Sequence, residues 1–222
     1  MLEGLPCRAC AVDAVPPAMH CAAMELREFF TLTDRACYDM AGKGYQMIYW
    51  DSHSQYCSVC GAKTALHTEI SKLCPDCGHE MFPNIAVAIL VLVRKEESAL
   101  LVRGRNFRGP HYGLVAGFLE PGETLEECVR REVREETSLT VGAVRYFGSQ
   151  PWPYPSGLMA GFIADYAQGE IILQNEELSA GAFFPRETLP ELPNTLSLAR
   201  RIIDWWINGE DEKSPGRFAG KL

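Results

Sequence analysis

Apolar and polar residues change their spacing several times along the chain, and each change marks an expected element of structure. Between residues 25 and 50 apolar residues recur at helical spacing, which predicts one or two helices. The uninterrupted apolar run over residues 85–93 predicts a buried strand. Apolar spacing over residues 195–207 predicts a closing amphipathic helix, with Asn194 before it as a candidate cap. Further strands are expected near residues 100–102, 144–147, 158–166 and 182–184.

A helix expected after Thr124 changes character along its inward side. Its apolar stripe is continued by three carboxylates at spacing i, i+3, i+4, namely Glu132, Glu135 and Glu136. Carboxylates on a core-facing stripe repel one another and are costly to desolvate unless divalent cations compensate their charge. Clustered oxygen ligands suit Mg²⁺ or Mn²⁺ and the phosphates that these ions carry. The ordinary alternative for such a pattern is a charged, solvated helix.

The segment before this helix favours the metal interpretation. Residues 117–123 form a turn with two glycines, and Thr124 is a candidate cap with Glu127 three residues on. The result is a strand, loop and helix unit in which the carboxylates are aimed at the loop.

At this point the sequence resembles the Nudix hydrolases, whose motif reads G-x5-E-x7-R-E-U-x-E-E-x-G-U, where U is apolar. The matching positions are Gly117, Glu123, Arg131, Glu132, Val133, Glu135, Glu136 and Leu139. Arg131 is expected to pair with Glu123 and to fix the loop against the helix. Ser138 stands where the motif has its last glycine, in a conformation that costs Ser about 1 kcal/mol.

Cysteine spacing predicts a second kind of metal site. Two C-x-x-C knuckles, each followed by glycine, are typical of a four-cysteine structural zinc ribbon, with ligands Cys57, Cys60, Cys74 and Cys77. Four thiolates leave no open position, so this zinc is expected to support the fold. The third pair, Cys7 and Cys10, lacks a partner knuckle, and Cys21 is isolated. Cys37 and Cys128 are expected to be small core hydrophobes.

Composition fits a globular protein. Hydrophobic residues make up 47% of the 222, and the net charge of −8 gives no diffuse attraction to nucleic acid or to an anionic membrane. No stretch approaches the ~18 apolar residues of a membrane span. Residues 1–30 lack the basic start and apolar core of a leader. A cytoplasmic protein without membrane contact is therefore expected.

A Pro-rich aromatic segment follows the motif. Residues 149–155 read S-Q-P-W-P-Y-P, a stiff extended stretch that would serve as a ligand-binding wall or as a loop pinned into the core by Trp152. It resembles the S-Q-P-W-P-F-P-x-S signature of the NADH pyrophosphatase branch of the Nudix family, which also carries a four-cysteine zinc ribbon. The resemblance covers residues 25–207. Departures are Gly157 for the last Ser of the signature and Asn84 for an Arg after the ribbon.

The resemblance implies an α+β fold, a Nudix mixed-sheet α/β/α sandwich preceded by a zinc ribbon and a short helical N-terminal region. The expected division is residues 1–55 for that partly helical region, 56–82 for the ribbon, 83–208 for the Nudix domain and 209–222 for a polar tail. Family members usually have a longer N-terminal domain, so this one is expected to be truncated or divergent there. A homodimer is also implied.

The implied reaction is hydrolysis of the pyrophosphate of NADH, and of NAD⁺, to nicotinamide mononucleotide and AMP, and removal of NAD caps from RNA. Glu177 is implied as a further metal ligand or water activator, with Glu176 as its nearest rival. Substrate contacts are implied for Phe82, Phe118, Gln150, Trp152 and Ala199. Arg103, Arg105 and Arg108 bracket a Gly-containing loop and are candidates for phosphate contact.

Two other functions remain open from the residues. The departures at Gly157 and Asn84 would fit a Nudix enzyme that prefers ADP-ribose or another nucleoside diphosphate derivative. The ribbon alone would fit a non-catalytic nucleic-acid-binding module, although residues 56–82 carry no basic stripe.

Overall fold

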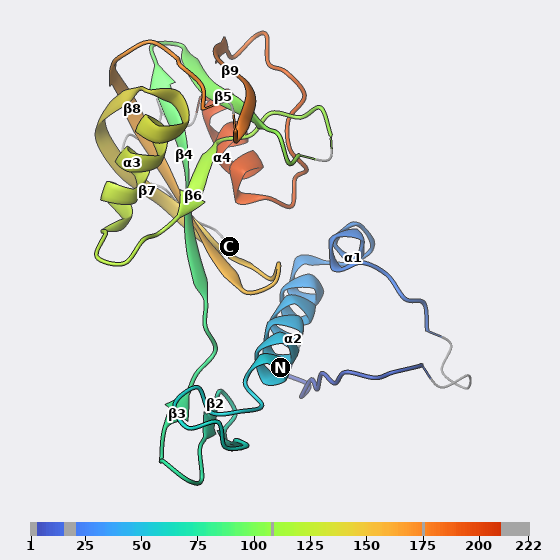
Figure 1. The fold of residues 1–222 in the computed structure, drawn as a ribbon. Coiled ribbons are helices and arrows are strands. Elements are labelled where there is room, and N and C mark those ends of the chain that lie inside the picture. Colours follow the sequence, from blue (N-terminus) through green and yellow to red (C-terminus); the bar gives the residue numbers. More distant parts are fainter. Residues whose placement is uncertain (1–3, 16–20, 108, 175, 210–222) are drawn as a thin grey trace. The chain divides into compact units, whose positions relative to one another are not determined.

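A computed structural model describes residues 4–15, 21–107, 109–174 and 176–209. The chain forms two compact units (Figure 1). The first unit consists of the chain up to Ile85 together with the later segment Pro151–Gly157. The second unit consists of Ala86–Gln150 and the chain from Leu158 onward. Residues 210–222, which hold most of the expected polar tail, lie outside the described residues, and so does Arg108. No helix in the described ranges is long and apolar enough to cross a membrane.

The first unit begins with the two helices expected between residues 25 and 50. They are α1 (Leu26–Leu32) and α2 (Arg35–His53). Asp34 caps α2 by accepting a hydrogen bond from the Cys37 backbone N–H at 2.8 Å. Cys37 is half-buried in this first turn, so its expected place in a core is wrong, because the capped end of the helix faces solvent.

The ribbon follows as a small antiparallel sheet of β1 (Ala65–Thr68), β2 (Ser71–Leu73) and β3 (Glu80–Met81). Lys72 of β2 is buried, and its ammonium donates to the backbone carbonyl of Asp51 at 2.8 Å and pairs with the Asp51 carboxylate at 2.8 Å. A cation at the last carbonyls of a helix compensates their unpaired dipoles. The ribbon thus holds the C-terminal end of α2.

The second unit is built on a six-stranded sheet of order β7-β8-β4-β5-β9, with β6 paired to β4. Its strands are β4 (Ala86–Lys95), β5 (Ser98–Gly104), β6 (Val115–Phe118), β7 (Thr140–Trp152), β8 (Gly157–Gln168) and β9 (Leu178–Pro185). All strands expected from the apolar runs are present, and most of them extend further at both ends. Small and polar residues at those ends, such as Gly142 and Gly181, interrupt the apolar runs, which explains why the pattern underestimated the lengths.

Alternate residues of β4 face two different cores, which defines the layers. Ile89 and Val91 pack in a cluster with apolar residues of α3 (Leu125–Thr137), whereas Leu90 packs in a cluster with those of α4 (Leu198–Ile207). Because successive side chains of a strand point to opposite faces, α3 and α4 cover opposite sides of the sheet. The expected α/β/α sandwich is confirmed.

The closing helix begins later than the apolar spacing predicted. Its cap is Ser197, whose hydroxyl accepts a hydrogen bond from the Arg200 backbone N–H at 3.2 Å, and the prediction of Asn194 as the cap is wrong. Asn194 is used one turn earlier, where its side chain accepts from the Leu196 backbone N–H at 3.0 Å. The Asn194 side chain is thus engaged in a local turn and does not cap the helix.

Candidate active site and zinc ribbon

Helix α3 begins with a capping box at Thr124 and ends with a left-handed residue, Ser138. The Thr124 hydroxyl accepts from the Glu127 backbone N–H at 3.2 Å, and the Glu127 carboxylate accepts from the Thr124 backbone N–H at 2.8 Å, which confirms the expected capping box. Cys128 and Val129 are fully buried on the inward face. At the other end Ser138 adopts φ 62°, ψ 8°, the left-handed conformation that favours glycine.

Ser138→Gly should therefore stabilise the protein, by about 1 kcal/mol in urea unfolding, because glycine adopts this conformation without steric cost. The Ser138 hydroxyl also donates to the Ile172 carbonyl at 3.3 Å. Ser138→Ala, which removes that bond but keeps the backbone strain, should not stabilise. An equal increase in the free energy of unfolding for Ser138→Gly and Ser138→Ala would contradict the explanation by backbone strain.

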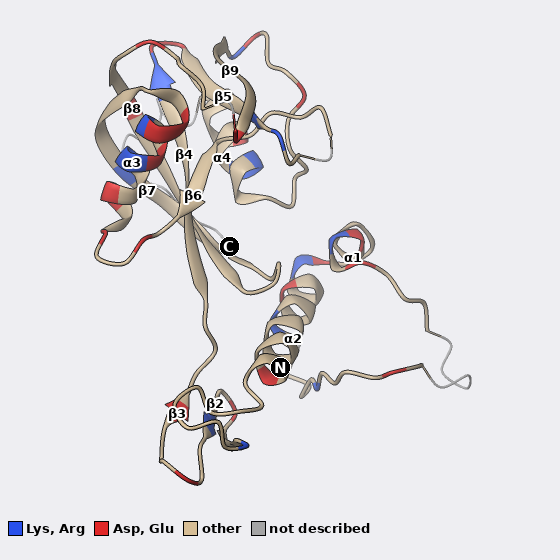
Figure 2. Cartoon of the chain, viewed as in Figure 1, with Lys and Arg blue, Asp and Glu red and all other residues tan. Residues whose placement is uncertain are grey.

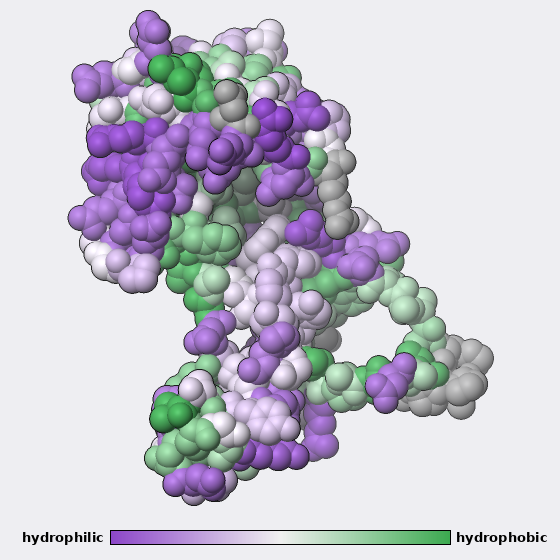
Figure 3. All heavy atoms as spheres, in the orientation of Figure 1, coloured by the Kyte–Doolittle hydropathy of each residue, from purple (hydrophilic) through white to green (hydrophobic). Residues whose placement is uncertain are grey.

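The carboxylates of α3 differ in their exposure. Glu132 and Glu136 are 8% and 5% exposed, whereas the side chain of Glu135 is 55% exposed. The inward anionic stripe is thus confirmed for two residues, and Glu135 lies at its rim. Figure 2 shows acidic and basic residues close together on α3, and Figure 3 shows a hydrophilic surface over this helix. A Cβ atom at Gly117 would overlap the Glu132 carboxylate, so glycine at that position makes the space for it.

Arg131 joins the loop to the helix as expected. Its Nε donates to Glu123 at 2.6 Å, and its Nη2 donates to the other Glu123 oxygen at 3.0 Å and to the Phe118 carbonyl at 2.9 Å. Nη1 donates to Glu132 at 2.8 Å and to Glu135 at 3.0 Å. The bidentate pair fixes the loop, and the same guanidinium orients two of the three helix carboxylates.

Hydrogen bonds from Arg131 lower the pKa of Glu123 to about 2, against an ordinary value of 4.5. A depressed pKa means that the ion pair stabilises the fold fully above pH 4.5 and that this contribution is lost as the pH falls toward 2. Glu123→Gln should therefore lower the melting temperature at pH 7, and the difference from the parent should shrink steadily below pH 4.5. A difference that stays constant down to pH 2.5 would contradict the assignment.

Burial of Glu136 inside the site disfavours the ionised form of its carboxyl group. Its Oε2 atom is buried without a hydrogen-bond partner. Burial, with the charges of Glu132, Glu177 and Glu135, raises its pKa to about 8. Burial also raises the pKa of Glu132, although Arg131 opposes this. A buried anionic set with an orphaned oxygen fits a hard divalent cation.

The loop before β9 brings Glu177 to this set. The Gln174 backbone N–H donates to the Glu136 carbonyl at 2.9 Å, and the Arg105 backbone N–H donates to the Glu177 carbonyl at 2.8 Å. The charge of Glu177 acts on both Glu132 and Glu136. Glu177 thus contributes to the electrostatics of both residues, and Glu176 stays the alternative ligand on the same turn.

The four cysteines of the ribbon converge. Their sulfur atoms all lie within 4.8 Å of one another, and no other group of three or more ligand atoms in the described residues is drawn together so closely. The Cys57–Cys77 and Cys60–Cys74 sulfurs are 3.6 and 3.4 Å apart, close to the edge of about 3.8 Å that a tetrahedral site with Zn–S bonds of ~2.3 Å requires. Backbone N–H groups of Cys60 and Val59 lower the pKa of Cys57 to about 6, whereas the pKa values of Cys60 and Cys77 are raised next to the other thiols.

Comparison with known protein families decides the identity of the fold. The NUDIX domain model matches residues 83–206, more than half of the chain. The chain belongs to the Nudix family. The model of the NADH pyrophosphatase zinc ribbon domain matches residues 52–82, directly before the Nudix domain.

Several curated proteins are similar to this Nudix chain. The NAD-capped RNA hydrolase NudC of Pseudomonas aeruginosa is 39% identical over 183 residues, which are 82% of this chain and 66% of that protein. The protein of the same name from Pseudomonas fluorescens is 37% identical over 207 residues, 93% of this chain and 75% of that protein. The chain spans about two thirds of the length of these relatives. A Nudix hydrolase structure from Nitrosomonas europaea shares the fold, with a TM-score of 0.58 and 22% identity over 72% of this chain and 92% of that one.

The residues expected to contact substrate lie in different settings. Phe118 on β6 is 66% exposed and is paired with Ala88 of β4, so its ring lies on the face of the sheet opposite to that of Gly117 and Glu132. Gln150 is buried, with its amide donating to the Leu196 carbonyl at 3.0 Å and its carbonyl oxygen unpartnered. Ala199 of α4 packs at the edge of an apolar cluster. Phe82, 54% exposed, lines a hollow of about 560 Å³ in the first unit, together with aromatic residues that include Tyr56.

Trp152 is half-buried in the first unit, where it forms an edge-to-face pair with Tyr154 at 5.0 Å between ring centroids. Tyr38 and Arg27 contact this pair from more than 110 positions away, so no local pattern could indicate them. Trp152 is neither fully buried nor fully exposed. Its burial therefore does not decide between a ligand-binding wall and a loop that Trp152 pins into the core.

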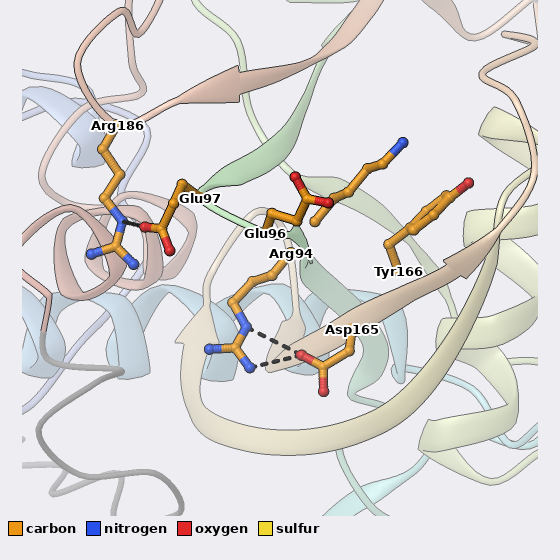
Figure 4. A pocket seen from close by; sticks show the side chains of 7 residues that line it. Arg94, Glu96, Glu97, Asp165, Tyr166 and Arg186 are labelled. Carbon is orange, nitrogen blue, oxygen red and sulfur yellow. Dashed lines mark hydrogen bonds and ion pairs between the residues drawn. The ribbon is translucent and has the colours of Figure 1, made fainter.

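A second hollow, of about 530 Å³, lies on the Nudix unit (Figure 4). Its two arginines are paired with anions: Arg94 bonds to Asp165 at 2.7 Å, and Arg186 lies 3.7 Å from Glu97. Three basic and three acidic residues line it in all. None of the residues predicted for the site lines it. This hollow offers no net charge to a phosphate, and the carboxylate face of α3 remains the candidate active site.

Proposed function

We propose that this Nudix protein hydrolyses the pyrophosphate bond of NADH, and of NAD⁺, to nicotinamide mononucleotide and AMP. The observation that carries the proposal is the pair of buried carboxyl groups of Glu132 and Glu136, of which Glu136 has an oxygen without a partner, beside the loop that Arg131 fixes. The zinc ribbon and the S-Q-P-W-P-Y-P segment support the choice of a dinucleotide, because the chain resembles NADH pyrophosphatases at both.

Glu132, Glu135, Glu136 and Glu177 would hold the divalent cations, Mg²⁺ or Mn²⁺. When bound, the ions neutralise charge on the phosphoryl oxygens and lower the pKa of a bound water. Arg131 keeps the loop and the helix carboxylates in register through its bonds to Glu123 and Glu132. Glu177 is the base that would take a proton from the attacking water, and Glu176 is the alternative on the same turn.

Aromatic residues would orient the dinucleotide. Phe118 offers an exposed ring at the end of β6, and stacking on a base contributes about 1–3 kcal/mol. The carbonyl oxygen of Gln150, which is buried without a partner, would accept a hydrogen bond from an amide or amine of the substrate. Phe82, Trp152 and Ala199 would complete the binding surface.

NAD-capped RNA is the second proposed substrate. Relatives that are 37–39% identical over most of this chain bear the name NAD-capped RNA hydrolase. The cap presents the same pyrophosphate, so one set of carboxylates would serve both substrates. We place the protein in the cytoplasm, where both substrates occur, and propose a homodimer, which the family resemblance implies.

Competition among substrates tests the proposed preference. NADH, NAD⁺ and ADP-ribose are offered together at equal concentration with Mn²⁺ or Mg²⁺, and the loss of each is followed by mass spectrometry. NADH should disappear first. Faster loss of ADP-ribose would contradict the preference and would point to the departures at Asn84 and Gly157.

A further inference from the structure

The segment Pro151–Gly157 packs against one face of α2. Tyr38, Gly42 and Gln46 follow one another at spacing i, i+4, i+8, so they lie on the same side of the helix. The Tyr38 hydroxyl is buried and lies 3.0 Å from the Tyr154 hydroxyl, close enough for a hydrogen bond. The Gln46 amide donates to the last carbonyl of the segment at 3.5 Å. Polar contacts thus hold the segment at both ends of this face.

Between them, the backbone of α2 comes close to the segment. A Cβ atom at Gly42 would lie 3.0 Å from the Pro153 Cγ atom, a tight contact. Glycine in the middle of a helix costs about 1 kcal/mol relative to alanine. Close approach of Pro153 explains why this position has no side chain.

Helix α1 covers the aromatic rings of the same segment. The guanidinium carbon of Arg27 lies 4.4 Å from the Tyr154 ring centroid and 5.7 Å from that of Trp152. A cation over an aromatic face at such distances is attractive. Phe30 supports Tyr38 from α1 through an edge-to-face contact at 5.3 Å. Both helices therefore contribute to one seat, which we define as Arg27, Tyr38, Gly42 and Gln46.

The seat acts on residues that continue directly from the Nudix sheet. The chain leaves the Nudix unit after Gln150, on β7, and re-enters it at Leu158. Trp152 is only two residues beyond Gln150, and its backbone carbonyl accepts from the Tyr154 backbone N–H at 2.8 Å. Its ring contacts the Tyr154 ring and the Arg27 guanidinium of the seat.

We propose that the seat residues are positioning residues, which hold the Pro151–Gly157 segment so that Trp152 is presented to the dinucleotide. They set the affinity of the protein for the dinucleotide and take no part in the chemistry. The effect on affinity rests on the proposed function, whereas the effect of the seat on the position of Trp152 does not. The N-terminal helices would then belong to the substrate-binding apparatus and would not be a mere appendage of the ribbon.

Tyr38→Phe tests the seat, because it removes the hydroxyl bonded to Tyr154 and keeps the ring. Tyr45→Phe is the matched control, since Tyr45 lies on the same helix and is 47% exposed. Both variants are labelled with 5-fluorotryptophan, and the Trp152 resonance among the four tryptophans is assigned with Trp152→Phe. Tyr38→Phe should shift that ¹⁹F resonance and raise KM for NADH about 3- to 10-fold, the effect of one lost hydrogen bond, with kcat within about twofold.

Tyr45→Phe should change neither quantity. An unchanged Trp152 resonance and KM in Tyr38→Phe would overturn the seat, and a loss of kcat at constant KM would overturn its role in affinity. Gly42→Ala provides a second test, because it improves helix propensity yet crowds Pro153, and it should move the same resonance. If the parent protein does not hydrolyse NADH, the proposed function fails, and the ¹⁹F comparison alone decides whether the seat holds Trp152.

Discussion

Glu136→Gln is expected to lower kcat for NADH by roughly 10³-fold, because bound metal supplies several kcal/mol of transition-state stabilisation and each 1.4 kcal/mol is a factor of ten. Glutamine keeps the size of the side chain and removes the charge that a cation requires. Steady-state kinetics with Mg²⁺ or Mn²⁺ measures the effect. Glu126→Gln is the matched control on the exposed side of α3, and it should keep kcat within about twofold.

The same variant should behave differently in a stability measurement without metal. The pKa of Glu136 is raised to about 8, so its ionisation destabilises the metal-free fold progressively as the pH rises from 4.5 toward 8. Glu136→Gln removes that penalty, and its melting temperature in EDTA should exceed that of the parent, more at pH 8 than at pH 5. A fully active variant would refute Glu136 as a metal ligand, and a less stable one would show that its charge is compensated in the fold.

Cys74→Ser is expected to abolish zinc binding and to unfold the ribbon. Structural zinc contributes about 10–16 kcal/mol in zinc-finger peptides, as much as or more than the whole stability of a typical domain. The zinc content should fall from one ion per chain to nearly none. Backbone protection from hydrogen exchange should be lost in β1–β3 and at the end of α2 that Lys72 holds, and kept in β4 and β5.

Cys10→Ser is the control for this experiment, because Cys10 is exposed and lies outside the group of four sulfurs. It should leave the zinc content at one. Retention of zinc by Cys74→Ser, or two zinc ions in the parent, would contradict a single four-cysteine site.

The parts of the molecule that were predicted correctly depend on short sequence separations. The capping box at Thr124, the ion pair between Glu123 and Arg131 and the two cysteine knuckles are local arrangements, so spacing alone was enough. Burial of Glu132 and Glu136 follows from helical periodicity, and Glu135 falls outside because it lies at the edge of the inward sector. The assignment of all four glutamates as metal ligands stays a prediction.

The features that escaped prediction depend on long-range packing. Strand β2 brings Lys72 to the end of α2, a contact that no local pattern around Lys72 marks. Tyr38 and Arg27 meet the Trp152 segment across more than 100 residues, and no local pattern marks them for that contact. Cys37 was misplaced for a related reason, since apolar character alone does not distinguish a helix end from its buried face.

The central claim is cleavage of the phosphoanhydride, and one product measurement tests it most directly. The purified chain is incubated with NADH and Mn²⁺ or Mg²⁺ in H₂¹⁸O, and the products are identified by mass spectrometry. The products should be reduced nicotinamide mononucleotide and AMP, and one of these two products should carry a single ¹⁸O atom on its phosphate. Release of free nicotinamide with ADP-ribose, or no conversion with either metal, would contradict it.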